Sequence, residues 1–195
     1  MLSESFVSLT SIEGVADIMP KPIKPIPNNA ECERILKGSY TGILVMCHNE
    51  EPYALPINHA YSDGKLYFHC APTGRKLDMI HANPNVCYVV NNYFGDLGDF
   101  VDGVRCHGNW ESVIAYGKAR VIDDPGELRE AFSSFGKYYY GPDFEPSESS
   151  LQTTGAIIIE VESMTARREV PREGLDRKTG RGGVDVRYWS WSPES

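Results

Sequence analysis

Short runs of apolar residues, each bounded by turn-forming residues, occupy the middle of the chain. Runs of this length that are rich in β-branched and aromatic side chains predict strands, because such side chains pack well on a half-buried, pleated surface. A longer run over residues 105–122 predicts a bent strand or a pair of strands, with Gly108 and Gly117 as bending points. The other predicted strands cover residues 40–47, 53–61, 65–70, 86–90 and 155–162.

Two tight turns connect the first three of these strands. Residues 48–51 form the first turn, and the Asp63-Gly64 pair forms the second. Asp-Gly is typical of a two-residue hairpin loop, because both positions of that loop take positive φ angles. The pattern therefore predicts an antiparallel meander of three strands.

Three segments carry helical signals. Asn29 as an N-cap and Gly38 as a stop bound the first helix, and residues 73–81 form the second. The third helix begins at a capping box opened by Asp124, carries an apolar stripe and stops at Gly136. The helices therefore lie between strands without the regular alternation of a parallel α/β fold.

Six strands with two or three helices predict an α+β protein that is mainly β. The expected architecture is a six-stranded antiparallel barrel with peripheral helices. A barrel of this size fills its interior with side chains, so a ligand has to bind outside it or where two barrels meet. We expect an extended arm over residues 1–28, the barrel over residues 29–170 and a polar tail over residues 171–195.

Charge and composition narrow the class of function. The chain has 195 residues, 19 of them basic and 27 acidic, and its net charge of −8 argues against nucleic-acid binding. Five cysteines without a C-x-x-C pair argue against a disulfide scaffold and a structural zinc site, so no metal is expected. With no signal-peptide pattern and no apolar run near the length of a membrane span, we expect a cytoplasmic protein.

The stretch from Tyr67 to Lys76 carries the most informative chemistry. A strand ends there and a helix begins with Gly74-Arg75-Lys76. A helix N-terminus offers unpaired N–H groups and the positive end of a dipole, and two cations at that end oppose the dipole. A bound phosphate would remove this conflict. The alternative is two solvated charges on a surface helix.

The order of features around this stretch resembles the FMN-binding split-barrel superfamily, which includes the pyridoxamine 5′-phosphate oxidases. The strand YALPIN at residues 53–58 is followed by the Asp63-Gly64 turn, the strand LYFH at 66–69 and the segment GRKLDMIHANPNVCY at 74–88. Within the superfamily the chain is most similar to the nitroimidazole-resistance branch. The similarity runs from about Arg34 to Arg167.

This resemblance implies a split barrel and a homodimer that binds FMN in a groove between its subunits. The backbone of residues 55–58 would line the flavin ring, and the start of the second helix would hold the phosphate. The residues implied in cofactor binding are Leu55, Pro56, Ile57, Asn58, Phe68, His69, Thr73, Arg75 and Lys76 of one subunit, with Trp110, Ser112 and Val113 of the other.

Several of these residues also have a purely structural interpretation. Pro56 fits an ordinary edge strand as well as a flavin groove. Trp110 can belong to the core, and His69 can be a hydrogen-bonded structural histidine instead of a catalytic group. Trp189 and Trp191 either cover a flavin or a partner surface, or form a terminal strand that packs on the barrel.

The predicted function is that of an FMN-dependent oxidoreductase that reduces a small acceptor, and the nitroimidazole-resistance branch suggests a nitroheterocycle. A non-catalytic flavin- or haem-binding protein on the same barrel is the alternative, with His69 or His107 as the haem ligand. Oxidation of a vitamin is not expected, because the C-terminal Arg-x-His element of the true pyridoxamine-phosphate oxidases is missing.

Overall fold

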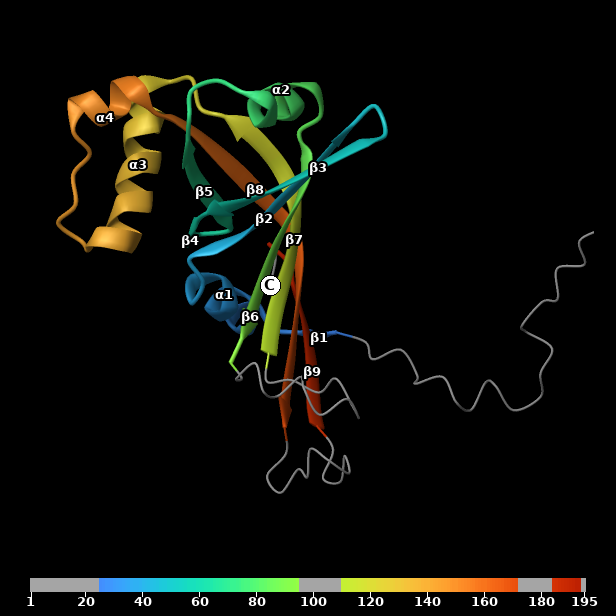
Figure 1. Cartoon of the computed structure of the whole chain (residues 1–195). Helices are drawn as coiled ribbons and strands as arrows, with labels where there is room; N and C mark the ends of the chain where they lie inside the picture. The colour runs from blue at the N-terminus through green and yellow to red at the C-terminus, as the bar shows by residue number, and fades with distance from the viewer. Residues whose placement is uncertain (1–24, 95–109, 172–183, 194–195) are drawn as a thin grey trace, which may run out of the picture.

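The computed structural model describes residues 25–94, 110–171 and 184–193, which form one curved sheet with four helices around it (Figure 1). The strands and helices of these segments follow one another along the chain. They are β1 (Ile26–Pro27), α1 (Asn29–Lys37), β2 (Thr41–His48), β3 (Glu51–Asn58), β4 (Ala60–Ser62), β5 (Lys65–Cys70), α2 (Arg75–Ala82), β6 (Asn85–Tyr93), β7 (Trp110–Val121), α3 (Pro125–Tyr140), α4 (Glu148–Thr153), β8 (Gly155–Pro171) and β9 (Val184–Trp191).

The sheet branches at β8, its longest strand. Its strand order is β1-β9-β8-β7-β6-β2-β3, and β5 adds to β8 while β4 adds to β5. The first part of β8 pairs with β5 and the second part with β9, so two different strands share one edge of β8. The predicted class, mainly β with peripheral helices in a split barrel, is confirmed. The described residues form nine strands, however, and not six, and β1 pairs in parallel with β9.

Part of the difference in strand number arises at His59. We predicted one strand over residues 53–61, but β3 pairs with β2 as far as Asn58 and β4 pairs with β5 from Ala60 onward. The chain changes partner at His59, whose imidazole is fully buried. Its Nε2 lies 3.1 Å from the Leu36 carbonyl oxygen, and its Nδ1 lies 2.8 Å from the Tyr88 hydroxyl.

The predicted turns are confirmed. Asn49 and Glu50 both take positive φ angles, of 50° and 63°, and His48 pairs with Glu51 across them. The Asp63-Gly64 loop is similar, with φ angles of 49° and 75°. Both loops therefore have the backbone that suits the twist of a two-residue hairpin.

The bend predicted in β7 is also confirmed. The pairing of β7 with β8 shifts register between Tyr116 and Gly117. A Cβ atom on Gly117 would overlap the Glu160 carbonyl, so the close approach of the two strands requires glycine. Gly108 lies outside the described residues.

The helix boundaries differ from the predicted ones in three places. The N-cap of α1 is Asn28 and not Asn29, because the Asn28 Oδ1 accepts from the Glu31 N–H at 3.1 Å. The α2 helix begins at Arg75, two residues later than predicted. The capping of α3 by Asp124 is confirmed, but Gly136 does not end that helix, which continues to Tyr140. Gly136 instead makes room for the Phe144 ring against the helix backbone.

The ends of the described chain join the sheet. Trp189 and Trp191 belong to β9 and are each 8% exposed, which confirms the alternative of a terminal strand packed on the barrel. The α1 helix packs on β7, β8 and β9, α2 packs on β2 and β7, and α3 covers β4, β5 and β8 (Figure 1). None of the helices in the described segments has the length and apolar character needed to cross a membrane.

Candidate functional site

The start of α2 is an open helix N-terminus. Gly74 is its N-cap, with a φ of 128° that glycine adopts easily, and it provides no side-chain cap. The Leu77 and Asp78 N–H groups donate to the Gly74 carbonyl, so the first-turn amides before them point outward. Thr73 and Arg75 are exposed and Lys76 is half-buried. This end of α2 has the amides and cations that bind an anion.

Arg75 ties this helix start to the beginning of β3. Its Nη2 donates to the Glu51 Oε1 at 2.5 Å, and its guanidinium lies 4.6 Å from the centre of the Tyr53 ring. Glu51 and Tyr53 share one face of β3 with Leu55 and Ile57, because side chains alternate along a strand. The helix start and the predicted ring-binding strand are therefore neighbours in the folded chain.

The β3 strand provides the long side of the candidate site. Among the strands that the structure describes it pairs only with β2, so Pro56 lies on an edge strand as predicted. Leu55 and Ile57 are half-buried against the core, whereas Pro56 and Asn58 are exposed. From Tyr53 to Ile57 the strand runs about 13 Å at 3.3 Å per residue. One end of this surface is therefore cationic and the other is apolar.

The two residues predicted at the end of β5 face opposite ways. Phe68 is 1% exposed and packs edge-on against Tyr88 in the core, so only its backbone can face a ligand. His69 faces α3, with its ring 4.4 Å from that of Phe135. His69 is exposed over part of its surface, and the burial of the rest lowers its pKa. Within the described chain, no hydrogen bond to its ring nitrogens is found.

An aromatic cluster on α3, which is absent from the predicted site, connects His69 to the end of β3. The Tyr139 hydroxyl donates to the carbonyl oxygens of Tyr40 and His59, at 2.6 and 2.9 Å. The Tyr139 ring stacks on Phe135 at 4.5 Å. A cavity of about 390 Å³ opens beside this cluster. It is lined by His69, Phe132, Phe135, Gly136, Tyr140, Phe144, Glu145, Ser147 and Ser150.

The sequence does contain a signal for this cluster. Three consecutive tyrosines, residues 138–140, follow the apolar stripe of α3. A stripe at helical spacing indicates a core face, but three adjacent tyrosines cannot all lie on that face. Their hydroxyls need partners when buried, which points to contacts with neighbouring backbone.

The residues predicted to come from a second subunit lie elsewhere in this chain. Ser112 of β7 pairs with Asn91 of β6, and β2 separates β6 from β3. Three strand spacings of about 4.8 Å place Ser112 about 14 Å from β3. Trp110 is half-buried beneath the Arg167 guanidinium at 5.2 Å, while Val113 is fully buried in the core. One chain therefore does not bring these residues to the β3 surface.

The outer face of the sheet is apolar where β2, β6 and β7 lie side by side. Ile43 pairs with Val89, and Val89 pairs with Ile114, so the three form a row across the strands. Ile43 is 40% exposed and Tyr116 is 52% exposed. An apolar sheet face that is left open to solvent is typical of a surface that another molecule covers.

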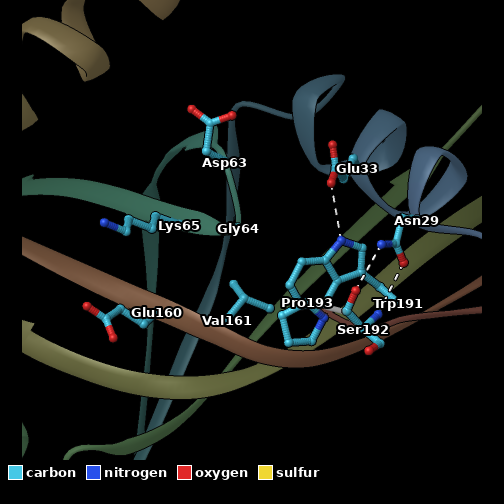
Figure 2. A pocket seen from close by; sticks show the side chains of 10 residues that line it. All are labelled: Asn29, Glu33, Asp63, Gly64, Lys65, Glu160, Val161, Trp191, Ser192 and Pro193. Carbon is cyan, nitrogen blue, oxygen red and sulfur yellow. Dashed lines mark hydrogen bonds between the residues drawn. The ribbon is translucent and has the colours of Figure 1, made fainter. Parts of the chain in front are cut away.

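A second cavity, of about 450 Å³, lies between the first half of α1 and the Asp63-Gly64 loop (Figure 2). The indole of Trp191 forms one wall, and its Nε1 donates to the Glu33 carboxylate at 3.2 Å. Lys65 and Glu160 stand on the opposite side in Figure 2. None of the predicted site residues lines this cavity. In the segments with described side chains, no three His, Cys, Asp or Glu residues are grouped as they would be around a metal ion.

Comparison with known proteins identifies the family. Residues 28–168 match the family model of pyridoxamine 5′-phosphate oxidase. The chain belongs to the pyridoxamine 5′-phosphate oxidase family. A curated relative, the uncharacterized protein RA0666 of Rhizobium meliloti (strain 1021), is 25% identical over 97 residues, which are 50% of this chain and 56% of that protein. The match thus spans about half the length of that relative.

Solved structures share the family fold. A proposed 5-nitroimidazole antibiotic resistance protein from Bacteroides thetaiotaomicron matches 72% of this chain and 84% of its own, with 25% identity and a TM-score of 0.62. An FAD- and haem-binding protein from Mycobacterium smegmatis matches 82% and 80%, with 13% identity and a TM-score of 0.62. An FAD-binding protein from Mesorhizobium loti matches 71% and 93%, with 22% identity and a TM-score of 0.54.

The residues present fit the phosphate-bearing flavin that this family implies. Gly74 leaves the first amides of α2 without a side-chain cap, and Arg75 and Lys76 add two cations at the same corner. The half-buried side chains of Leu55 and Ile57 continue from that corner along β3 as an apolar surface. A negatively charged group joined to a flat apolar ring matches both ends of this arrangement.

Proposed function

We propose that this protein binds FMN along β3, with the phosphate at the start of α2. The observation that carries the proposal is the contact of Arg75 with Glu51 and Tyr53, which joins the anion-binding end of α2 to the strand. Thr73, Arg75 and Lys76 hold the phosphate, and residues 55–58 line the ring. Phe68 contributes its backbone at the end of β5.

We also propose that the protein works as a homodimer. The apolar row of Ile43, Val89 and Ile114 supplies a surface for a second copy, because its burial removes apolar area from water. A second subunit would also bring Trp110, Ser112 and the backbone of the buried Val113 to the groove, which lies about 14 Å from them in one chain. A monomer in sedimentation that still binds FMN would contradict this part of the proposal.

The chemistry follows from the cofactor and its surroundings. A bound flavin supplies two-electron transfer to a small acceptor. The protein fixes the phosphate, orients the ring against β3 and excludes water with the aromatic cluster of α3. The His69 imidazole lies beside that cluster and can donate or accept one proton. A nitroheterocycle is the proposed acceptor, supported by the likeness to the Bacteroides protein.

Haem binding is the second candidate, and His69 is the observation that favours it. Its ring nitrogens have no hydrogen bond within the described residues, so one of them can serve as an axial ligand. A Soret band after haem addition that is lost in His69→Ala would favour this candidate. His107, the other histidine considered, lies outside the described residues.

The visible spectrum of the purified protein and a titration with FMN test the main proposal. We expect flavin absorption maxima and quenching of FMN fluorescence. Charged hydrogen bonds contribute about 1.5–3 kcal/mol each, so Arg75→Ala with Lys76→Ala should raise the Kd for FMN at least about tenfold.

The matched control removes two cations elsewhere. Lys118→Ala with Arg129→Ala changes the net charge equally, and both side chains pair with exposed glutamates that belong to neither α2 nor β3. An unchanged Kd in the Arg75 and Lys76 variant would refute the phosphate assignment. A colourless protein that fails to quench FMN would refute the proposed function as a whole.

A further inference from the structure

We propose that Glu51 is a built-in competitor for the phosphate site, because it holds the Arg75 guanidinium until a phosphate monoester displaces it. The inference rests on the proposed function and concerns the regulation of the same site. It predicts that Glu51 lowers the affinity for FMN, although it lies next to the residues that bind it. Glu51 therefore sets how much negative charge a ligand must carry to bind.

The Glu51 carboxylate contacts Arg75, the same cation that is proposed to bind the phosphate. Within the described chain, Arg75 has two partners, the Glu51 Oε1 at 2.5 Å and the Tyr53 ring at 4.6 Å. A guanidinium has five N–H donors, and this ion pair uses one of them. The contact with the Tyr53 ring uses none of the N–H donors, so the remaining donors can turn from the carboxylate toward a ligand.

The exposure of the pair makes the carboxylate replaceable. The Arg75 side chain is 53% exposed and that of Glu51 is 69% exposed. Ion pairs this exposed hold weakly, because water and salt screen them. A phosphate monoester carries nearly two negative charges near neutral pH and three strong acceptor oxygens, so it binds the same cation more strongly.

Displacement does not remove the charge of Glu51 from the site. The backbone of Glu51 is fixed, because Glu51 pairs with His48 at the first position of β3. A displaced carboxylate therefore stays within a side-chain length of the bound phosphate and repels it. The penalty grows with the charge of the ligand, and it disappears for a ligand without a phosphate.

The chain offers a matched control in the preceding residue. Glu50 occupies the two-residue turn with a φ of 63° and is exposed, and Arg75 pairs with Glu51 instead. Glu50→Gln removes the same charge from the same hairpin without releasing Arg75. Glu51→Gln removes the charge and the competitor together.

The experiment measures the Kd of FMN and of riboflavin by fluorescence quenching for the wild type, Glu51→Gln and Glu50→Gln. We expect Glu51→Gln to lower the Kd for FMN by about threefold to tenfold, on the scale of an exposed ion pair acting on a group with nearly two charges. Glu50→Gln should change it by less than about twofold. Neither variant should change the Kd for riboflavin, and the effect of Glu51→Gln should shrink at about 1 M salt, where the Debye length is about 3 Å.

Equal Kd values for FMN in the two variants would overturn the inference while leaving the proposed function intact. An equal gain for riboflavin in Glu51→Gln would also overturn it, because the gain would then come from the groove and not from the phosphate. A wild type that binds no FMN would refute the proposed function, and the inference would fall with it.

Discussion

Acidification should destabilise this protein through one buried histidine, His59. Its imidazole is fully buried where the chain passes from β3 to β4. The Leu36 carbonyl can only accept a hydrogen bond, so the His59 Nε2 carries the proton and Nδ1 accepts from the Tyr88 hydroxyl. Burial lowers the pKa of His59 from its ordinary 6.5 to about 4.

The size of the effect follows from proton linkage. Between the two pKa values the unfolded chain binds a proton at this position and the folded chain does not, so stability falls as the pH is lowered. The free energy of unfolding falls as the pH is lowered from about 6.5 to about 4. Over this range the titration of His59 lowers it by a total of about 3 kcal/mol. Between about pH 7 and about pH 5 the loss is about 2 kcal/mol, a large part of the 5–15 kcal/mol of a typical domain.

Urea unfolding of the wild type and His59→Gln at both pH values measures this loss. A glutamine amide can still donate to the Leu36 carbonyl, and the Tyr88 hydroxyl can turn to the Ile57 carbonyl, which lies 2.9 Å away. The variant should therefore fold, and its stability should fall about 2 kcal/mol less between the two pH values. The other histidines titrate equally in both proteins. Equal losses in the two proteins, or an NMR titration midpoint of His59 near 6.5, would refute the reasoning.

Two further substitutions test the packing that positions the site. Gly117→Ala should destabilise the protein by about 1–3 kcal/mol or more in urea unfolding, because its Cβ would overlap the Glu160 backbone. Gly126→Ala is the control, since a Cβ at Gly126 meets only a side-chain oxygen at 3.1 Å. Similar stabilities of Gly117→Ala and Gly126→Ala would contradict this. Tyr139→Phe should cost about 1–2 kcal/mol, because the carbonyl oxygens of Tyr40 and His59 both lose the hydroxyl donor, although the Tyr40 oxygen keeps the His59 N–H at 3.2 Å. Tyr140→Phe is its control, since Tyr140 is 75% exposed, and equal melting temperatures would argue against the role of the Tyr139 hydroxyl.

Local features of this protein could be predicted from its sequence because they depend on residues close together in the chain. The positive φ angles of Asp63 and Gly64 and the capping of α3 by Asp124 follow from backbone sterics or hydrogen bonds between near neighbours. The order of strands around Gly74-Arg75-Lys76 identified the family, and the family model matches residues 28–168.

Contacts between distant segments could be decided only by the tertiary structure. Side chains alternate along β5, so the sequence shows that Phe68 and His69 point to opposite faces of the sheet. It does not show which face is buried, because that depends on how β5 pairs with β8. The contact of Arg75 with Glu51 and the hydrogen bond from Tyr139 to Tyr40 join residues 24 and 99 positions apart. Such pairs exist only after the sheet has formed, because closing long loops costs entropy. The local preferences of neighbouring residues do not offset this cost.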